Sequence, residues 1–335
     1  MTIHCLPPSA IFTPQRYVCI LRMCSLAAFY RRNKIIKKLI ITLFLCSVVW
    51  AKPVTFMMIA DVHVCEQPRP QHILGWEELE IRLDNFVEAA NSYNPDFVIQ
   101  LGDLADGLKE GGSGTASETT MINRLNKGKM YLADRIDAPF FNVMGNHEYR
   151  DPRWNKENIR LAMDSNFIDT NDTWYAFEME EFAFIVLNDA YCDTNVNEHK
   201  IPQEELDWLE TVTQDINKPT FVFMHIPLTE GNGGPYDQTI GQEEALQILQ
   251  DDPDFQCGFF GHCHHDPNWH TDKIQYDDEG HPFYHINTVN LWDEYYIPPL
   301  WTIIKVGDDP PVYRPWPIRR CGDDCWRYEV YMEKY

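Results

Sequence analysis

Five apolar segments of this chain each end at polar side chains that can bind a metal ion. Three of the five polar motifs also contain a glycine. The motifs are Asp61-Val62-His63, Gly102-Asp103, Gly145-Asn146-His147-Glu148, Met224-His225 and Gly261-His262-Cys263-His264. Ligands of α/β sheets bind beyond the carboxyl ends of the strands, where such side chains meet. One motif alone would be an ordinary cap or turn, but five in one chain predict a metal site.

The remaining pattern from residue 52 onward is typical of one α/β domain, because short apolar segments alternate with amphipathic ones. No stretch has the composition of a linker, and no repeat is evident. Strands are predicted over 54–60, 97–101, 140–144, 175–178, 182–188, 220–224 and 257–260. Helices are predicted over 76–90, in the later part of 113–136, from 202 to 212 and over 243–249. The segment after Pro282 is strand-like and rich in proline, and from about 290 we expect an irregular C-terminal tail.

The N-terminal segment, residues 1–51, carries seven basic and no acidic side chains. Its last part, 39–51, is apolar and follows a cluster of Arg and Lys, and Val49 and Ala51 occupy the −3 and −1 positions of a cleavage site. This order is typical of a secretory signal peptide and predicts a secreted or periplasmic protein. Residues 1–22 form a possible upstream extension. The apolar run is shorter than the roughly 20 residues that cross a bilayer, so an uncleaved anchor is the alternative and no stable membrane span is expected.

The acidic composition argues against nucleic acid as a partner, and the predicted export affects how the cysteines are interpreted. The chain has 28 Lys and Arg against 51 Asp and Glu, a formal charge of −23, and no run of Lys and Arg interrupts the acidic part after residue 51, so nucleic-acid binding is not expected. Export would permit disulfides among the six cysteines after residue 51, which allow 15 full pairings. Cys321 and Cys325 are the favoured local pair. The six are Cys65, Cys192, Cys257, Cys263, Cys321 and Cys325.

The number of candidate donor side chains indicates how many metal ions are bound. Seven donors, three carboxylate or amide groups and four imidazoles, are too many for one ion but suit two ions that share a bridging carboxylate. A mixture of His and carboxylate donors suits Mn, Fe or Zn. The seven are Asp61, His63, Asp103, Asn146, His225, His262 and His264.

The order of the five motifs resembles that of the calcineurin-like metallophosphoesterase superfamily, from about residue 54 to 290. This resemblance implies a four-layer α/β/β/α sandwich with the metal site at the carboxyl ends of the strands. It also implies that Asp103 bridges two divalent or trivalent ions. By this resemblance one ion is held by Asp61, His63, Asp103 and His264, and the other by Asp103, Asn146, His225 and His262.

The resemblance further implies that His147 is the catalytic histidine and that Glu148 orients its ring. A water between two such ions becomes a hydroxide near neutral pH and attacks the phosphorus atom. Protonated His147 would stabilise the developing charge or protonate the leaving oxygen. Arg150, three residues further on, is a candidate phosphate contact.

The expected reaction is hydrolysis of a phosphodiester or phosphoanhydride in a small phosphorylated substrate, with nucleotide-derived compounds as one class. The segments 97–107 and 142–149 look most like the cyclic-nucleotide phosphodiesterase and manganese-dependent ADP-ribose diphosphatase branches. Purple acid phosphatases have Tyr three residues after the bridging Asp, where this chain has Asp106. Two alternatives remain: a phosphomonoesterase with the same site, and a non-catalytic binding protein with this fold.

Overall fold

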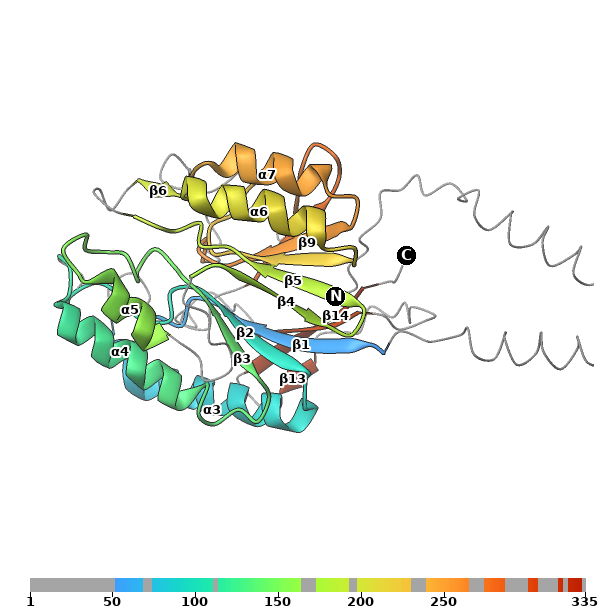
Figure 1. Ribbon diagram of the computed structural model, residues 1–335. Coiled ribbons are helices and arrows are strands. Elements are labelled where there is room, and N and C mark those ends of the chain that lie inside the picture. Colours follow the sequence, from blue (N-terminus) through green and yellow to red (C-terminus); the bar gives the residue numbers. More distant parts are fainter. Residues whose placement is uncertain are drawn as a thin grey trace, which may run out of the picture. The chain divides into compact units, whose positions relative to one another are not determined.

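The first of two large β-sheets in this computed structural model has six strands, and β1, β2 and β3 are parallel neighbours in it (Figure 1). Strand order is β13-β14-β12-β1-β2-β3. The structure describes residues 52–68, 74–110, 114–163, 173–192, 198–229, 239–264, 274–286, 301–306, 319–321 and 325–332. The strands of this sheet are β1 (Val54–Ile59), β2 (Phe97–Leu101), β3 (Phe140–Val143), β12 (Thr302–Val306), β13 (Arg319–Cys321) and β14 (Cys325–Met332).

The second sheet also has six strands, in the order β10-β11-β9-β7-β5-β4. Its inner strands β11, β9, β7 and β5 are parallel, whereas β4 and β5 form the predicted antiparallel pair. A short parallel pair, β6 (His199–Lys200) and β8 (Thr239–Ile240), lies apart from it. The six strands are β4 (Tyr175–Met179), β5 (Phe182–Val186), β7 (Thr220–Phe223), β9 (Phe255–Phe260), β10 (Ile274–Tyr276) and β11 (Pro282–His285).

Helices cover the outer face of each sheet, which completes four layers (Figure 1). One hydrophobic cluster joins α3 and α4 to the first sheet, and another joins α6 and α7 to the second. The short helix α5 packs beside α4. This arrangement confirms the predicted α/β/β/α sandwich. The helices are α3 (Trp76–Tyr93), α4 (Glu118–Tyr131), α5 (Lys156–Met163), α6 (Gln203–Asp215) and α7 (Gln242–Asp251).

Phenylalanine side chains fill the core between the two sheets. Strand β1 alternates its side chains, so Phe56 and Met58 enter this core while Met57 and Ile59 contact the helical layer. The Phe56 ring stacks on a ring of the same sheet and meets a Phe of the opposite sheet, Phe223, edge to face at 5.7 Å between centroids. Burial of one such side chain stabilises the fold by roughly 1.5–3 kcal/mol. The packing fixes both sheets, and with them the strand ends.

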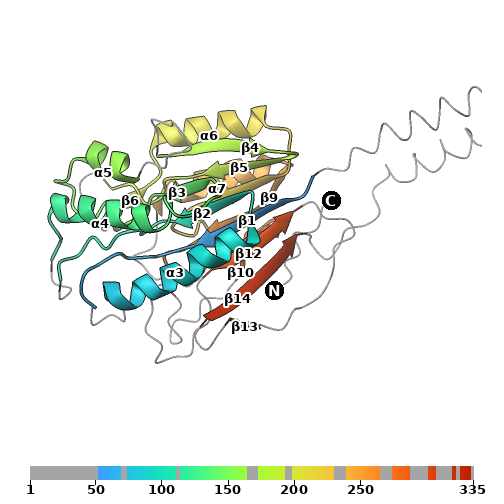
Figure 2. The same ribbon diagram turned by 90° about the horizontal axis from the view of Figure 1, so that it is seen from below.

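The expectation of an irregular tail from about residue 290 is wrong where the three strands β12, β13 and β14 lie. Strand β12 runs antiparallel to β1, with Ile304 opposite Phe56, and β14 runs parallel to β12 (Figure 2). Ile304 and Val306 are buried between the sheets, so these late residues complete the core around β1. Neighbouring prolines concealed this in the sequence, because a short strand is stabilised mainly by the partner that it finds in the fold. Cys321 lies opposite Cys325 in the β13–β14 register, and their disulfide stays a prediction.

The predicted signal segment, residues 1–51, lies outside the described residues. Within the part of the chain that the structure describes, no helix has both the length and the apolar character required to cross a bilayer.

Candidate metal centre and active site

The five predicted motifs all lie where a strand ends, and the backbone of three of them is strained there. Strands β1, β2, β3, β7 and β9 lead into them. Among the described residues other than glycine, only two outside these motifs have a positive φ, Asn94 and Glu180. A left-handed backbone costs such a residue roughly 1–2 kcal/mol, so this strain is concentrated at the site. The strained residues of the site are Asp61 (φ 51°), His63 (46°), Asp103 (55°), His262 (63°) and His264 (25°).

Glycines allow the loops to approach one another closely. A Cβ atom on Gly145 would overlap the backbone nitrogen and the carboxylate of Asp103, and one on Gly102 would overlap the His225 ring. Gly102 also has a φ of 82°, which glycine adopts without a steric penalty. These two positions therefore require glycine for the donor side chains to meet.

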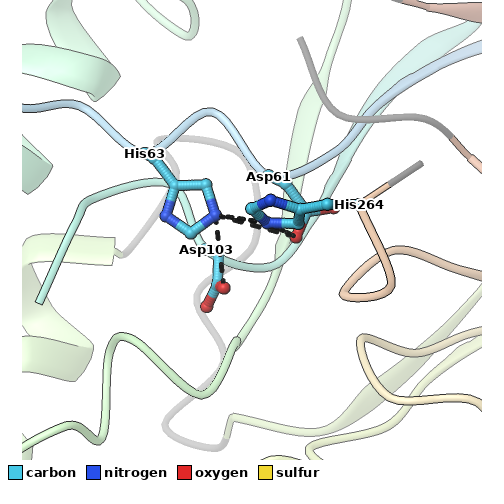
Figure 3. Close-up of side chains that lie close together, drawn as sticks. All are labelled: Asp61, His63, Asp103 and His264. Carbon is cyan, nitrogen blue, oxygen red and sulfur yellow. Dashed lines mark hydrogen bonds and ion pairs between the residues drawn. The ribbon is translucent and has the colours of Figure 1, made fainter. Parts of the chain in front are cut away.

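The first group of donors comprises Asp61, His63, Asp103 and His264, shown in Figure 3. One donor atom from each lies within 4.8 Å of those of the others. His264 Nε2 is 2.7 Å from His63 Nε2 and 3.2 Å from Asp61 Oδ1. His63 Nε2 is 3.6 Å from Asp103 Oδ2. The four residues come from the ends of β1, β2 and β9, so both sheets contribute to the group.

The second group comprises Asp103, His225 and His262, with the Asn146 amide beside them. His225 Nε2 is 3.4 Å from Asp103 Oδ2 and 3.0 Å from Asn146 Oδ1. His262 Nδ1 is 3.2 Å from both Asn146 Oδ1 and His225 Nε2. Asp103 Oδ2 therefore faces both groups, as a bridging carboxylate would.

The chemistry of these groups fits bound cations. The two imidazole nitrogens of the first group, His63 Nε2 and His264 Nε2, point at each other at 2.7 Å. Burial lowers the pKa of His225, but the Asp103 carboxylate outweighs it and raises the pKa to about 10, so the pocket strongly attracts positive charge. Imidazole and carboxylate donors suit Mn, Fe or Zn. The structure thus brings all seven predicted donors together in a set that fits two ions, and their role as ligands stays a prediction.

Further hydrogen bonds fix the orientation of His225. Its Nδ1 donates to the Leu101 carbonyl oxygen at 2.8 Å, which leaves Nε2 facing the other donors. The buried Asp189 carboxylate accepts from the backbone N–H groups of His225 and Ile226, at 3.0 and 2.8 Å. Outer contacts of this kind set the tautomer and ring direction of metal-binding histidines. Asp189 was not predicted, although its place at the end of the 182–188 strand was a signal of the same kind as the others.

His147 lies beside the two groups, and its ring is held by Asp106. Its Nδ1 is 3.0 Å from Asp106 Oδ1, and its Nε2 is 4.0 Å from Asp103 Oδ2. The backbone nitrogen of Gly107 is 3.2 Å from the same Nδ1. His63, Asp106 and His147 also lie within 4.8 Å of one another. Because Nδ1 faces Asp106, Nε2 is the nitrogen turned toward the donor groups.

Glu148 does not orient the His147 ring as the sequence suggested. Its buried carboxylate accepts from the backbone N–H groups of Gly145, Asp103 and Ala105, at 2.8, 3.0 and 3.2 Å. Burial and the nearby Asp103 charge raise its pKa to about 8. Glu148 thus joins the loops after β2 and β3, and the contact expected of it is made by Asp106. The signal for Asp106 was an acidic residue three positions after Asp103 in the same loop.

Arg150 lies close to His147. Its backbone N–H donates to the His147 carbonyl oxygen at 3.3 Å, and its side-chain stem is beside Gly107. Arg153, by contrast, is 82% exposed and bound to Asp151. Arg150 therefore remains the candidate phosphate contact that the sequence predicted.

Comparisons with known proteins agree with this arrangement. The family model described as calcineurin-like phosphoesterase matches residues 54–266. A dimetal phosphatase structure from zebrafish (Danio rerio) is 15% identical, with a TM-score of 0.52 over 71% of this chain and 88% of that chain. A purple acid phosphatase from yellow lupin seeds (Lupinus luteus) is 13% identical, with a TM-score of 0.49 over 72% of this chain and 45% of that chain. No curated protein sequence matches this chain.

Proposed function

Because the chain belongs to the calcineurin-like phosphoesterase family, we propose that it hydrolyses a phosphodiester or phosphoanhydride bond of a small substrate. As a member of that family it is a metal-dependent phosphoesterase, and the family uses two metal ions. The observation that carries the proposal is the position of Asp103 Oδ2, which lies 3.6 Å from His63 Nε2 in one donor group and 3.4 Å from His225 Nε2 in the other.

We assign one ion to Asp61, His63, Asp103 and His264. The other ion is assigned to Asp103, Asn146, His225 and His262. Two bound ions supply Lewis acidity that draws electrons from a phosphoryl group and activates water. Burial by itself raises the pKa of Asp103, but the charges of His225 and His147 lower it well below its usual range, so it is ionised for this role.

His147 is proposed to hold the proton that the leaving oxygen needs. Its Nε2 is on the side of the donor groups, whereas its Nδ1 faces Asp106 at 3.0 Å. The buried Asp106 carboxylate would stabilise the charged imidazolium and keep Nε2 directed at the substrate. Such a proton transfer typically contributes about 10²–10⁴ in rate.

A diester or anhydride is favoured by the segments 97–107 and 142–149, which resemble those of nucleotide-hydrolysing branches of the family. Nucleotide-derived compounds are accordingly the first substrate class to test. Hydrolysis of phosphomonoesters at the same site is the alternative, and the matched zebrafish protein carries the description of a dimetal phosphatase.

The test compares hydrolysis of bis(4-nitrophenyl) phosphate with that of 4-nitrophenyl phosphate by the purified protein, with Mn²⁺, Fe²⁺ or Zn²⁺ and with a chelator. We expect turnover that the chelator abolishes and that favours the diester. A preference for the monoester would replace the proposed reaction by a phosphatase reaction. Failure of both compounds and of a nucleotide diphosphate panel, in protein holding two metal ions per chain, would favour the non-catalytic binding protein.

We also propose that the protein is exported and that residues 1–51 are removed. The support is the sequence pattern of that segment, since it lies outside the described residues. Sequencing the N-terminus of the protein recovered from the medium or periplasm is expected to give Lys52 as the first residue. An intact N-terminus on membrane-bound protein would favour the uncleaved anchor.

A further inference from the structure

A single buried arginine on α4 contacts two of the loops that carry the donor side chains. Arg124 is 1% exposed. Its Nη1 donates to the backbone carbonyl oxygens of Asp106 and Leu108, at 2.6 and 2.7 Å. Its Nε and Nη2 donate to Glu66 Oε2 at 3.0 and 2.6 Å. Four hydrogen bonds from one guanidinium thus join the loop after β1 to the loop after β2.

Two of the three residues that Arg124 contacts lie three positions after a donor residue. Glu66 follows His63 by three positions, and Asp106 follows Asp103 by three. The two loops are also hydrogen-bonded side by side, with the N–H of Val64 donating to the Leu104 carbonyl at 3.0 Å. Helix α4 approaches both loops closely at Gly128, where a Cβ atom would lie 2.9 Å from Leu104 Cδ1. Arg124 therefore lies on the face of α4 that packs against the site.

Arg124 holds the backbone on both sides of Gly107, and this short segment makes every described contact of the His147 Nδ1 atom. The Asp106 carboxylate and the Gly107 N–H face that nitrogen at 3.0 and 3.2 Å. The N–H of Leu108 also donates to Asp106 Oδ1 at 3.0 Å, which fixes the carboxylate. A shift of the 106–108 backbone would therefore move the partner of His147 directly.

The positive charge of Arg124 is balanced by the Glu66 carboxylate, which stabilises the contact between the two side chains. Burial raises the pKa of Glu66, but the hydrogen bond and the charge of Arg124 lower it below its usual value. Glu66 is thus ionised at neutral pH. Arginine suits this position because its planar fork directs several N–H groups at once, whereas lysine offers one nitrogen atom.

We propose that Arg124 is a positioning residue for the Asp106–His147 pair and acts on turnover through the backbone of residues 106–108. This inference rests on the proposed role of His147 in the reaction. A merely structural arginine would stabilise the fold equally whether or not the His147 imidazole were present. A positioning residue loses its effect when that imidazole is removed.

The experiment is a double-mutant cycle of Arg124→Lys and His147→Ala in the metal-loaded protein. Displacement of a catalytic group by about 1 Å can cost roughly 10²-fold, so we expect Arg124→Lys to lower kcat by about 10- to 100-fold with little change in KM. In the His147→Ala background the same substitution is expected to change kcat by less than about threefold. Each variant should retain two metal ions per chain.

A second variant and a second measurement keep the test decisive if Arg124→Lys folds poorly. Glu66→Gln removes the charge of a partner that is 41% exposed, and we expect a kcat loss of about 3- to 10-fold that also disappears in the His147→Ala background. In metal-free protein, amides 105–108 should exchange hydrogen for deuterium faster in Arg124→Lys than in the parent. The matched control is Arg135→Lys, a surface arginine bound to Asp84, which should match the parent in both measurements.

Several outcomes would overturn the proposal. They are full kcat in Arg124→Lys, equal losses in both backgrounds, and unchanged exchange at 105–108. Failure of the proposed function would be seen separately, without any substitution of Arg124. The parent protein would show no hydrolysis, or His147→Ala alone would keep full activity.

Discussion

The two donor groups are held in place in different ways. In the first, the loops carrying Asp61, His63 and Asp103 are hydrogen-bonded backbone to backbone, with the His63 N–H donating to the Asp103 carbonyl at 2.9 Å. In the second, His225 depends on the Asp189 carboxylate and the Leu101 carbonyl. A hydrogen bond between two backbone groups persists when a side chain is replaced, whereas the contact of the Asp189 carboxylate is lost when Asp189 is replaced. The second group should therefore be the more sensitive to substitutions around it.

Exposure to solvent does not separate the groups. Each contains one partly exposed histidine, His264 in the first and His262 in the second, while the aspartates of both groups are buried. The difference between the groups therefore lies in the contacts that orient their donors.

The largest effect is expected for Asp103→Asn, which removes the one carboxylate shared by both groups. Loss of both metals and of turnover should follow, beyond the roughly 10- to 100-fold in affinity that an outer contact alone can cost. The measurements are metal content by mass spectrometry and rate. Asp96→Asn, at the opposite end of the same sheet, is the control. Retention of one tightly held ion would mean that the groups are independent.

His147→Ala should lower turnover by about 10²–10⁴ while both ions remain, because this side chain belongs to neither group. Steady-state kinetics with metal analysis checks this. His281→Ala, a half-buried histidine bound to Asp277, is the control. Loss of a metal from His147→Ala would place this histidine among the ligands, together with His63 and Asp106.

Asp189→Asn addresses the difference between the groups directly. The asparagine has an NH₂ group in place of one carboxylate oxygen, and this group cannot accept a hydrogen bond from a backbone N–H. His225 would therefore be less well oriented. We expect one of the two ions to bind about 10- to 100-fold more weakly, measured by calorimetric titration. Asp277→Asn is the matched control, since this aspartate also accepts from two backbone amides, those of Glu279 and His281. Equal weakening of both ions would contradict the distinction drawn between the groups.

The smallest effect concerns Glu205, which supports the second group from one layer further out. Its carboxylate accepts from the Asn188 N–H at 2.7 Å, next to Asp189, and burial raises its pKa to about 8 from 4.5. Between these two pH values the folded protein binds more protons than the unfolded chain. The free energy of unfolding should therefore fall as pH rises, by at most about 1.4 kcal/mol per pH unit.

Glu205→Gln removes this proton and should be the more stable form near pH 8, with the advantage disappearing toward pH 4.5. Urea unfolding between these limits measures it. Glu204→Gln, exposed on the same turn of α6, should unfold in parallel with the parent. Parallel curves for Glu205→Gln as well would mean that Glu205 titrates normally in the folded protein.

Much of the fold and of the candidate site could be predicted from local patterns. Apolar runs located the strands around the site, and the polar residue after each run located its donors, because the carboxyl ends of parallel strands meet at one edge. The family and the four-layer fold were confirmed. Strand β12 was missed because five residues among prolines carry little signal, while its antiparallel pairing with β1 depends on contacts some 250 residues away in sequence.

The sequence by itself determined which residue types stand at the strand ends, and hence the family and the seven candidate donors. Only the tertiary structure decided which groups surround them. In the folded protein Asp106 contacts His147, Glu148 accepts hydrogen bonds from three backbone amides, and Arg124 of α4 donates to groups of two loops. The reason is physical: strand-end chemistry repeats locally along the chain, whereas the partner of a buried polar group is whichever group the packing of sheets and helices brings within 3 Å.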